Sequence, residues 1–210
     1  MTEHKTFEHH YETAIAELSR TALLSPGKKE FLDEAVLLIR ETVAADLVEL
    51  LEFVPVTASF IFRSGVGWAP GLVGEQTFPL KPKELAGACL RSAHPIVIKD
   101  FGVRTSVVRP PYLVQHNVVS AVVSAIKGVP RPFGVLGLHW IKAKEFDRGE
   151  IDFARAAGEV IAISLQLMDR ISEMRELERF CSQQARQGQE SGSGDGFDGH
   201  SARGRDQKLG

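Results

Sequence analysis

Two short apolar runs lie close together near the middle of the chain. Residues 118–126 and 133–141 are both rich in Val, Ile and Leu, and Lys-Gly-Val-Pro-Arg-Pro separates them. Each run is short for a buried helix, and the glycine and prolines between them are typical of a turn, so the pattern predicts a β-hairpin. Neither run alternates between apolar and polar residues. A strand that is apolar on both sides is covered on both faces, so we expect this hairpin at the centre of a sheet between helical layers.

The segments before the hairpin supply helices, further strands and two loops. Apolar residues at helical spacing predict helices over about residues 6–24 and 28–44, separated by Ser-Pro-Gly. The remaining regular elements are short, namely strands at 46–54, 58–63 and 96–98 and a helix at 83–92. Residues 64–74 form a glycine-rich loop, and residues 99–117 form a long irregular one. Loops of that length inside a domain are often functional.

The segment after the hairpin predicts one long helix. Asp147 and Glu150 have the spacing of a capping box, and the apolar pattern continues to about Arg186. Beyond Met168 the pattern narrows to a stripe that is typical of a helix–helix seam, made of Ile171, Met174, Leu177 and Cys181. We therefore divide the chain into an N-terminal helix (1–27), a globular domain (28–168), a helical extension (169–187) and a disordered Gly- and Ser-rich tail (188–210).

Charge and composition exclude several classes of protein. A formal net charge of −2 gives no reason to expect nucleic acid or an anionic membrane as a partner. No apolar stretch approaches the ~18 residues that a membrane span needs, and no secretory signal is visible, so we expect a cytoplasmic protein. Cys89 and Cys181 are far apart in sequence and suggest neither a disulfide framework nor a zinc site.

Several local motifs resemble the GAF domains of bacterial sensor histidine kinases and related signalling proteins. They are FRSGVGWAPGLVGE at 62–75, HPIVIKD at 94–100, VVSAVVSAI at 118–126, PFGVLGLHW at 132–140 and FDRGEIDFARAAGEVIA at 146–162. The resemblance covers residues 28–168. It implies an α+β fold, the GAF-like (PAS/profilin-like) α/β/α sandwich, with a central six-stranded antiparallel sheet and the N- and C-terminal helices packed on one face.

The resemblance also implies a function. We expect a stand-alone sensory domain that binds a small molecule under its loops and acts as a homodimer. Because no kinase, cyclase or DNA-binding segment is visible, the signal is expected to pass to a partner such as a sensor kinase or response regulator of a two-component system. The alternative is a ligand-free GAF module for dimerisation or adaptor function, and a more remote one is a GAF-type redox enzyme.

Candidate ligand-binding residues lie in the two loops. Trp68 can close one side of a pocket, or it can anchor its loop to the sheet edge. In haem-binding GAF sensors the ligand histidine directly follows Pro-Pro-Tyr; here Leu113 follows Tyr112, and the nearest imidazole is His116. Haem binding therefore stays a hypothesis, because the position of the usual ligand histidine is occupied by Leu113. His116 can otherwise play a structural part, or bind a small anion such as nitrate. Two arginines of the same loop, Arg104 and Arg109, can add donors.

The central strands offer a second set of candidates. His139 lies within an apolar run, where it is either a ligand contact or a buried, satisfied side chain. Ser120 and Ser124 share one strand face because side chains alternate with a period of two, but the pattern does not say which face lines a pocket. The GAF reductases of free methionine sulfoxide use clustered cysteines. That motif is missing here, so we expect no enzymatic activity.

Overall fold

The computed structural model describes residues 2–74, 76–103 and 105–192. It divides into two compact units, residues 1–169 and 170–210. The first unit is built on one six-stranded antiparallel sheet with the strand order β3-β2-β1-β6-β5-β4. The strands are β1 (Leu47–Val54), β2 (Ser59–Val66), β3 (Thr77–Pro79), β4 (Ile96–Ile98), β5 (Ser120–Ile126) and β6 (Gly134–Trp140). The predicted α+β fold with a six-stranded antiparallel sheet is confirmed.

The predicted hairpin is formed by β5 and β6. The two strands pair in register from Ser120 opposite Trp140 to Ile126 opposite Gly134. β6 lies between β5 and β1, and all of its residues are buried. The sheet centre is therefore covered on both faces, as the lack of alternation in the sequence indicates.

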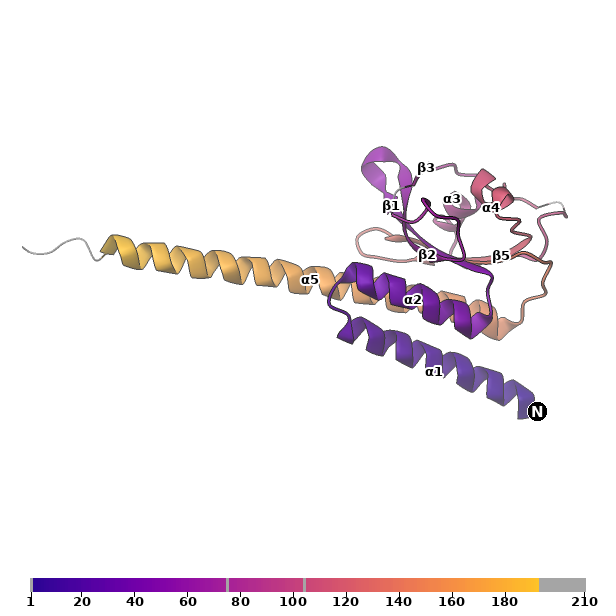
Figure 1. The fold of residues 1–210 in the computed structure, drawn as a ribbon, viewed down its shortest axis with the longest axis horizontal. Helices are drawn as coiled ribbons and strands as arrows, with labels where there is room; N and C mark the ends of the chain where they lie inside the picture. Colours follow the sequence, from indigo (N-terminus) through magenta and orange to yellow (C-terminus); the bar gives the residue numbers. More distant parts are fainter. Residues whose placement is uncertain (1, 75, 104, 193–210) are drawn as a thin grey trace, which may run out of the picture. The chain divides into compact units, whose positions relative to one another are not determined.

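Three helices cover one face of this sheet. Figure 1 shows α2 (Lys28–Val43) and the beginning of α5 (Arg148–Gly192) against the sheet, with α1 (Thr2–Leu24) outside them. Their buried apolar side chains form a core with the sheet, and fully buried members include Phe31, Ile39, Leu136 and Ile161. This placement of the terminal helices on one face agrees with the prediction.

The start of α5 is fixed by the expected capping box. The Glu150 N–H donates to Asp147 Oδ1 at 2.8 Å, and the Asp147 N–H donates to Glu150 Oε2 at 3.2 Å. Each side chain thus satisfies a backbone donor that the first helical turn leaves free.

The opposite face carries loops and two short helices, α3 (Leu85–Cys89) and α4 (Pro111–Gln115). The sequence predicted residues 99–117 as irregular, and α4 is a correction. Pro111 occupies the first turn of this helix, where its missing N–H costs no hydrogen bond, so a proline begins the helix here instead of breaking it. Strand β3 was not predicted from local pattern, because its three residues become a strand only by pairing with β2.

The predicted boundary of the tail differs from the structure. Helix α5 continues through Gly192, so residues 188–192 are helical. The rest of the predicted disordered tail, residues 193–210, lies outside the described residues. Among the described helices, none combines the length and apolarity that crossing a membrane requires.

Removing buried side-chain volume from α2 is expected to destabilise the first unit. Ile39 is 0% exposed and Leu37, on the same helix, is 50% exposed. Ile39→Ala should lower the free energy of unfolding by about 2–5 kcal/mol, because it leaves a cavity between the helices and the sheet. Leu37→Ala, the matched control, should change it by less than about 1 kcal/mol. Urea unfolding followed by circular dichroism measures both; equal losses would contradict the assignment of the α2 core face.

Candidate ligand site

A carboxylate is buried at the centre of the sheet, on the face that carries the loops. Glu49 of β1 is 1% exposed, and its carboxylate has one oxygen with partners and one without. The Tyr112 O–H, from α4, donates to Glu49 Oε1 at 3.1 Å. Oε2 has no hydrogen-bond partner. Buried polar atoms in proteins are nearly always paired, so this orphan oxygen marks the position as special.

His139 of β6 lies beside this carboxylate. Its Nε2 is 3.1 Å from Glu49 Oε1, and the side chain is 0% exposed. Neither ring nitrogen of His139 makes a hydrogen bond. The pKa of Tyr112 is raised well above its ordinary value, first because burial disfavours the phenolate and second because the Glu49 carboxylate lies next to it. The three side chains form a polar cluster in an otherwise apolar layer, which we call the Glu49 cluster.

Two glycines make room for the cluster. Glu49 is paired with Gly65 of β2 on one side and with Gly137 of β6 on the other. A Cβ atom at Gly137 would lie 2.6 Å from His139 Nε2 and 2.8 Å from Glu49 Oε1. A Cβ atom at Gly65 would lie 2.9 Å from Cδ1 of Trp68. The two sequence motifs that carry the family resemblance, RSGVGW and GVLGLHW, thus supply the space in which the cluster is assembled.

Trp68 covers the cluster. The half-buried indole donates from Nε1 to the Val48 carbonyl oxygen at 2.7 Å, which anchors the glycine-rich loop to β1. Its ring meets the rings of His139 and His116 edge-on, with centroids 5.6 and 4.9 Å away, and lies 5.7 Å from that of Tyr112. The hydrogen bond to Val48 agrees with the interpretation of Trp68 as an anchor of its loop, and the closing of a ligand pocket stays a prediction.

His116 joins the two loops. Its Nε2 accepts from the Ala69 N–H at 3.0 Å, and its Nδ1 lies 2.8 Å from the Tyr112 carbonyl oxygen. A ring nitrogen that accepts from a backbone N–H carries no proton, so Nδ1 is the donor and the imidazole is neutral. Both nitrogens are therefore used in holding the glycine-rich loop against α4.

The residues at the haem-ligand position of related sensors do not fit haem. Leu113 is fully buried in the loop-side core, and the nitrogens of His116 are engaged by backbone groups. The cavity beside Tyr112 measures about 10 Å³, which is close to the minimum for one water molecule. Within the described residues no group of three potential ligand side chains is placed to hold a metal ion.

The serines of β5 lie on the other face of the sheet. The Ser120 Oγ donates to the Lys142 carbonyl oxygen at 2.7 Å, and Ser124 faces Gly158 of α5. Ser120, a candidate ligand contact from the sequence, is thus separated from the Glu49 cluster by the sheet. The period of two placed both serines on one face correctly, but only the packing of α5 identifies that face as the helical one.

The loop cations and the thiol on this side also have structural partners. Arg109 donates to the Val118 carbonyl oxygen at 2.8 Å, and its guanidinium lies over the Phe101 ring. Arg104 lies outside the described residues.

The Cys89 thiol is buried and donates to the Val123 carbonyl oxygen at 3.3 Å. Burial raises the pKa of Cys89 to about 12, so the thiol stays protonated at neutral pH.

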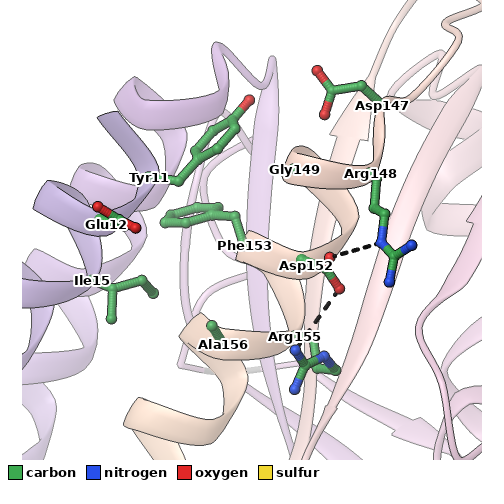
Figure 2. Close-up of a pocket in the computed structure, with 10 residues that line it drawn as sticks. All are labelled: Tyr11, Glu12, Ile15, Asp147, Arg148, Gly149, Asp152, Phe153, Arg155 and Ala156. Atoms are coloured by element: carbon green, nitrogen blue, oxygen red, sulfur yellow. Dashed lines mark hydrogen bonds and ion pairs between the residues drawn. The ribbon is translucent and has the colours of Figure 1, made fainter. Parts of the chain in front are cut away.

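A separate groove of about 540 Å³ lies on the helical side, between α1 and the start of α5. Figure 2 shows the rings of Tyr11 and Phe153 side by side, and Asp152 between Arg148 and Arg155, with which it forms ion pairs. Burial, together with the nearby carboxylates of Glu150 and Asp147, raises the pKa of Tyr11 to about 12. The sequence did not predict this groove, because it is formed by helices from opposite ends of the chain.

The site residues thus divide into two groups. Trp68, Tyr112, His116 and His139, all named from the sequence, converge on one face, whereas Ser120 does not. Glu49 was missed, because the segment DLVELLEFV reads as an apolar strand. Glu49 could have been found as an acidic residue in the middle of an apolar strand, since charged side chains are seldom fully buried unless they are paired.

Comparisons with solved structures agree with this fold. A GAF domain of a phosphoenolpyruvate-protein phosphotransferase from Coxiella burnetii matches with a TM-score of 0.71 at 15% identity, covering 79% of this chain and 98% of that one. Free methionine-R-sulfoxide reductase from Neisseria meningitidis, in complex with its substrate, has a TM-score of 0.66 at 10% identity, covering 77% and 91%. Bacteriophytochrome RpBphP3 from R. palustris has a TM-score of 0.72 at 15% identity, covering 92% of this chain and 43% of its own.

A search of curated proteins found no match to this sequence. The model of the GAF domain family, by contrast, matches residues 28–165, which include all six strands, both short helices and the Glu49 cluster. The chain therefore belongs to the GAF domain family.

Proposed function

We propose that this GAF domain is a cytoplasmic sensory module that binds a small molecule at the Glu49 cluster and signals through its terminal helices. GAF domains are generally sensory or signalling modules. The observation that carries the proposal is the pair of buried polar groups without hydrogen bonds, Glu49 Oε2 and His139 Nδ1. A ligand that pairs with them would remove a desolvation penalty that the free protein bears.

The strands offer a direct route from this site to the helices. On β6, Gly137 and His139 face the Glu49 cluster. The alternate residues of the same strand, Leu136 and Leu138, point to the other face and belong to the core under α5. A shift of β6 therefore reaches both layers. Such coupling requires the ligand to bind one arrangement of α5 more tightly than another.

The output is proposed to involve a homodimer and a partner protein, such as a sensor kinase or response regulator. Among the described residues of the second unit, the large exposed apolar side chains of α5 are Ile171, Met174, Leu177 and Phe180. Ile171, Met174 and Leu177 are each three residues from the next and span about 120° of the helix surface, which suits packing against another helix.

A second candidate function is a ligand-free dimerisation or adaptor module. The observation that favours it is the size of the cavity beside Tyr112, about 10 Å³, since at that place the protein's own side chains fill the space between the sheet and α3 and α4. This candidate shares the homodimer with the first but predicts no response to any small molecule.

We propose that the chain is not an enzyme. One structural neighbour is a free methionine-R-sulfoxide reductase, so the two cysteines of this chain are the groups to consider for a redox reaction. Of the two cysteines, Cys89 is buried, protonated and bonded to backbone, and Cys181 is exposed in the second unit. Within the first unit, Cys89 therefore provides no accessible thiolate beside the Glu49 cluster.

Ligand binding is tested by thermal unfolding with the small-molecule fraction of a cytoplasmic extract. At about 100 times its dissociation constant a ligand stabilises the folded protein by about 2.7 kcal/mol, which corresponds to about 5–10 °C in melting temperature for a chain of this size. His139→Ala should abolish the shift, and Ser120→Ala, on the opposite face of the sheet, should keep it. No shift with any fraction would leave the adaptor function as the better proposal.

Dimerisation through α5 is tested by adding one charge to the apolar side of the helix. Met174→Lys should lower the native mass from dimer towards monomer in light scattering, because a buried ammonium would be left unpaired at the seam. Ser172→Lys adds the same charge about 160° away around the helix and should leave the mass unchanged. If both variants stay dimeric, this face of α5 is not the seam.

The two thiols are expected to react very differently with a disulfide reagent at pH 8. Cys181 should react within seconds, and Cys89 only at the rate at which the domain opens, because its thiol is buried and its raised pKa leaves little thiolate. Cys181→Ser should remove the fast phase alone. Rapid modification of Cys89 in the folded protein would instead favour the redox enzyme.

A further inference from the structure

We propose that the Glu49 cluster selects a small organic cation, a ligand with an ammonium group that donates hydrogen bonds. The inference rests on the proposed function, since it names the ligand class for the same site. It departs from the expectation of a small anion at His116.

The charge of the cluster is the first argument. Glu49 is 1% exposed, and among the described residues no lysine or arginine lies within 4.0 Å of its carboxylate. Its neighbours are the neutral phenol of Tyr112 and the imidazole of His139, and Oε2 accepts no hydrogen bond. A buried carboxylate with a free oxygen attracts a cationic donor strongly and repels an anion.

The aromatic surroundings are the second argument. Tyr112 donates to the carboxylate, the ring centroids of Tyr112 and Trp68 are 5.7 Å apart, and that of His139 lies 5.6 Å from the indole. Aromatic rings near a carboxylate are common surroundings of a bound ammonium group, because cation–π attraction can add to the ion pair.

The loop donors that an anion would need are already used. Both nitrogens of His116 bond to backbone groups of Ala69 and Tyr112, and the Arg109 guanidinium bonds to the Val118 carbonyl oxygen. The free hydrogen-bonding capacity of the site is the acceptor oxygen of Glu49 and the ring of His139, which as a neutral imidazole offers one N–H donor and one acceptor nitrogen. That single donor lies beside the Glu49 carboxylate, which repels an anion.

Trp68 lies next to the other rings of the cluster, those of Tyr112 and His139, so a ligand that enters from the side of the glycine-rich loop has to displace the indole. That loop has left-handed backbone at Gly71 and Gly74, with φ of 87° and 83°, and a Cβ atom at either position would meet nothing within 4 Å. Glycine adopts this conformation without strain, and both positions are open. Cation binding should therefore alter the environment of the Trp68 ring.

The test is a fluorescence titration of the full chain carrying Trp140→Phe, which leaves Trp68 as its remaining tryptophan. Methylammonium chloride is the cationic probe, and sodium chloride, sodium nitrate and sodium acetate are the comparisons at constant ionic strength. We expect a saturable change in Trp68 emission with methylammonium, with a dissociation constant on the order of millimolar for so small a probe. The melting temperature of the unsubstituted protein provides a second reading with the same salts.

Two substitutions in the cluster should act in opposite directions. Glu49→Gln keeps the shape but removes the charge, and it should weaken methylammonium binding about tenfold or more. Tyr112→Phe keeps the ring but removes the O–H that competes for Glu49 Oε1, and it should tighten binding about threefold. A purely structural role of the two residues would weaken binding in both variants.

The proposal is overturned if nitrate or acetate gives the saturable change, if no probe does, or if Glu49→Gln binds methylammonium as well as the parent. The sensory function is tested separately, by thermal unfolding with the extract fractions. If a fraction stabilises the Glu49→Gln variant as strongly as the unsubstituted protein, the protein is still a sensor, but its ligand is not a cation bound by Glu49.

Discussion

The loop face of this domain is arranged around a carboxylate that lies inside a β-sheet. Burying Glu49 is costly, and the structure limits the cost by donating the Tyr112 O–H to one oxygen and placing His139 beside it. Accommodating the side chain also requires space on both neighbouring strands, which Gly65 and Gly137 provide. The Trp68 ring contacts those of Tyr112 and His139 in the same cluster. One buried polar group thus explains why a glycine stands opposite it on each neighbouring strand.

The two faces of the sheet are filled by different chemistry. The helical face is apolar, and its core joins the sheet to α2 and α5 through side chains such as Ile39, Leu136 and Ile161. The loop face combines an apolar layer with the Glu49 cluster, and its contacts run through single hydrogen bonds such as Ala69 N–H to His116 Nε2. The glycine-rich loop is attached to this face through such single bonds, and a segment held in that way opens more easily than packed apolar area. The proposed function requires such a difference between the loop that admits a ligand and the helical layer that carries the signal.

Local pattern was sufficient for most of the secondary structure. The hairpin, the helices that frame the domain and the Asp147–Glu150 capping box follow from periodicity and turn residues, which act over a few neighbouring positions. Strand β3 and helix α4 could not be predicted in this way. The first is a strand because β2 pairs with it, and the second begins at a proline whose role depends on its place in the turn.

The sequence by itself determined a sheet buried on both faces and the helices at both ends, and it named Trp68, Tyr112 and His139 as candidate site residues. Only the tertiary structure decided which strand face each side chain occupies. Side chains alternate along a strand, so Ser120 and Ser124 must lie on the same face, but the alternation does not say what packs on that face. The packing of α5 is what identifies it as the helical side. The same holds for Glu49. Its role depends on residues 63 and 90 positions away, Tyr112 and His139, and contacts over such separations are set by packing and not by local pattern.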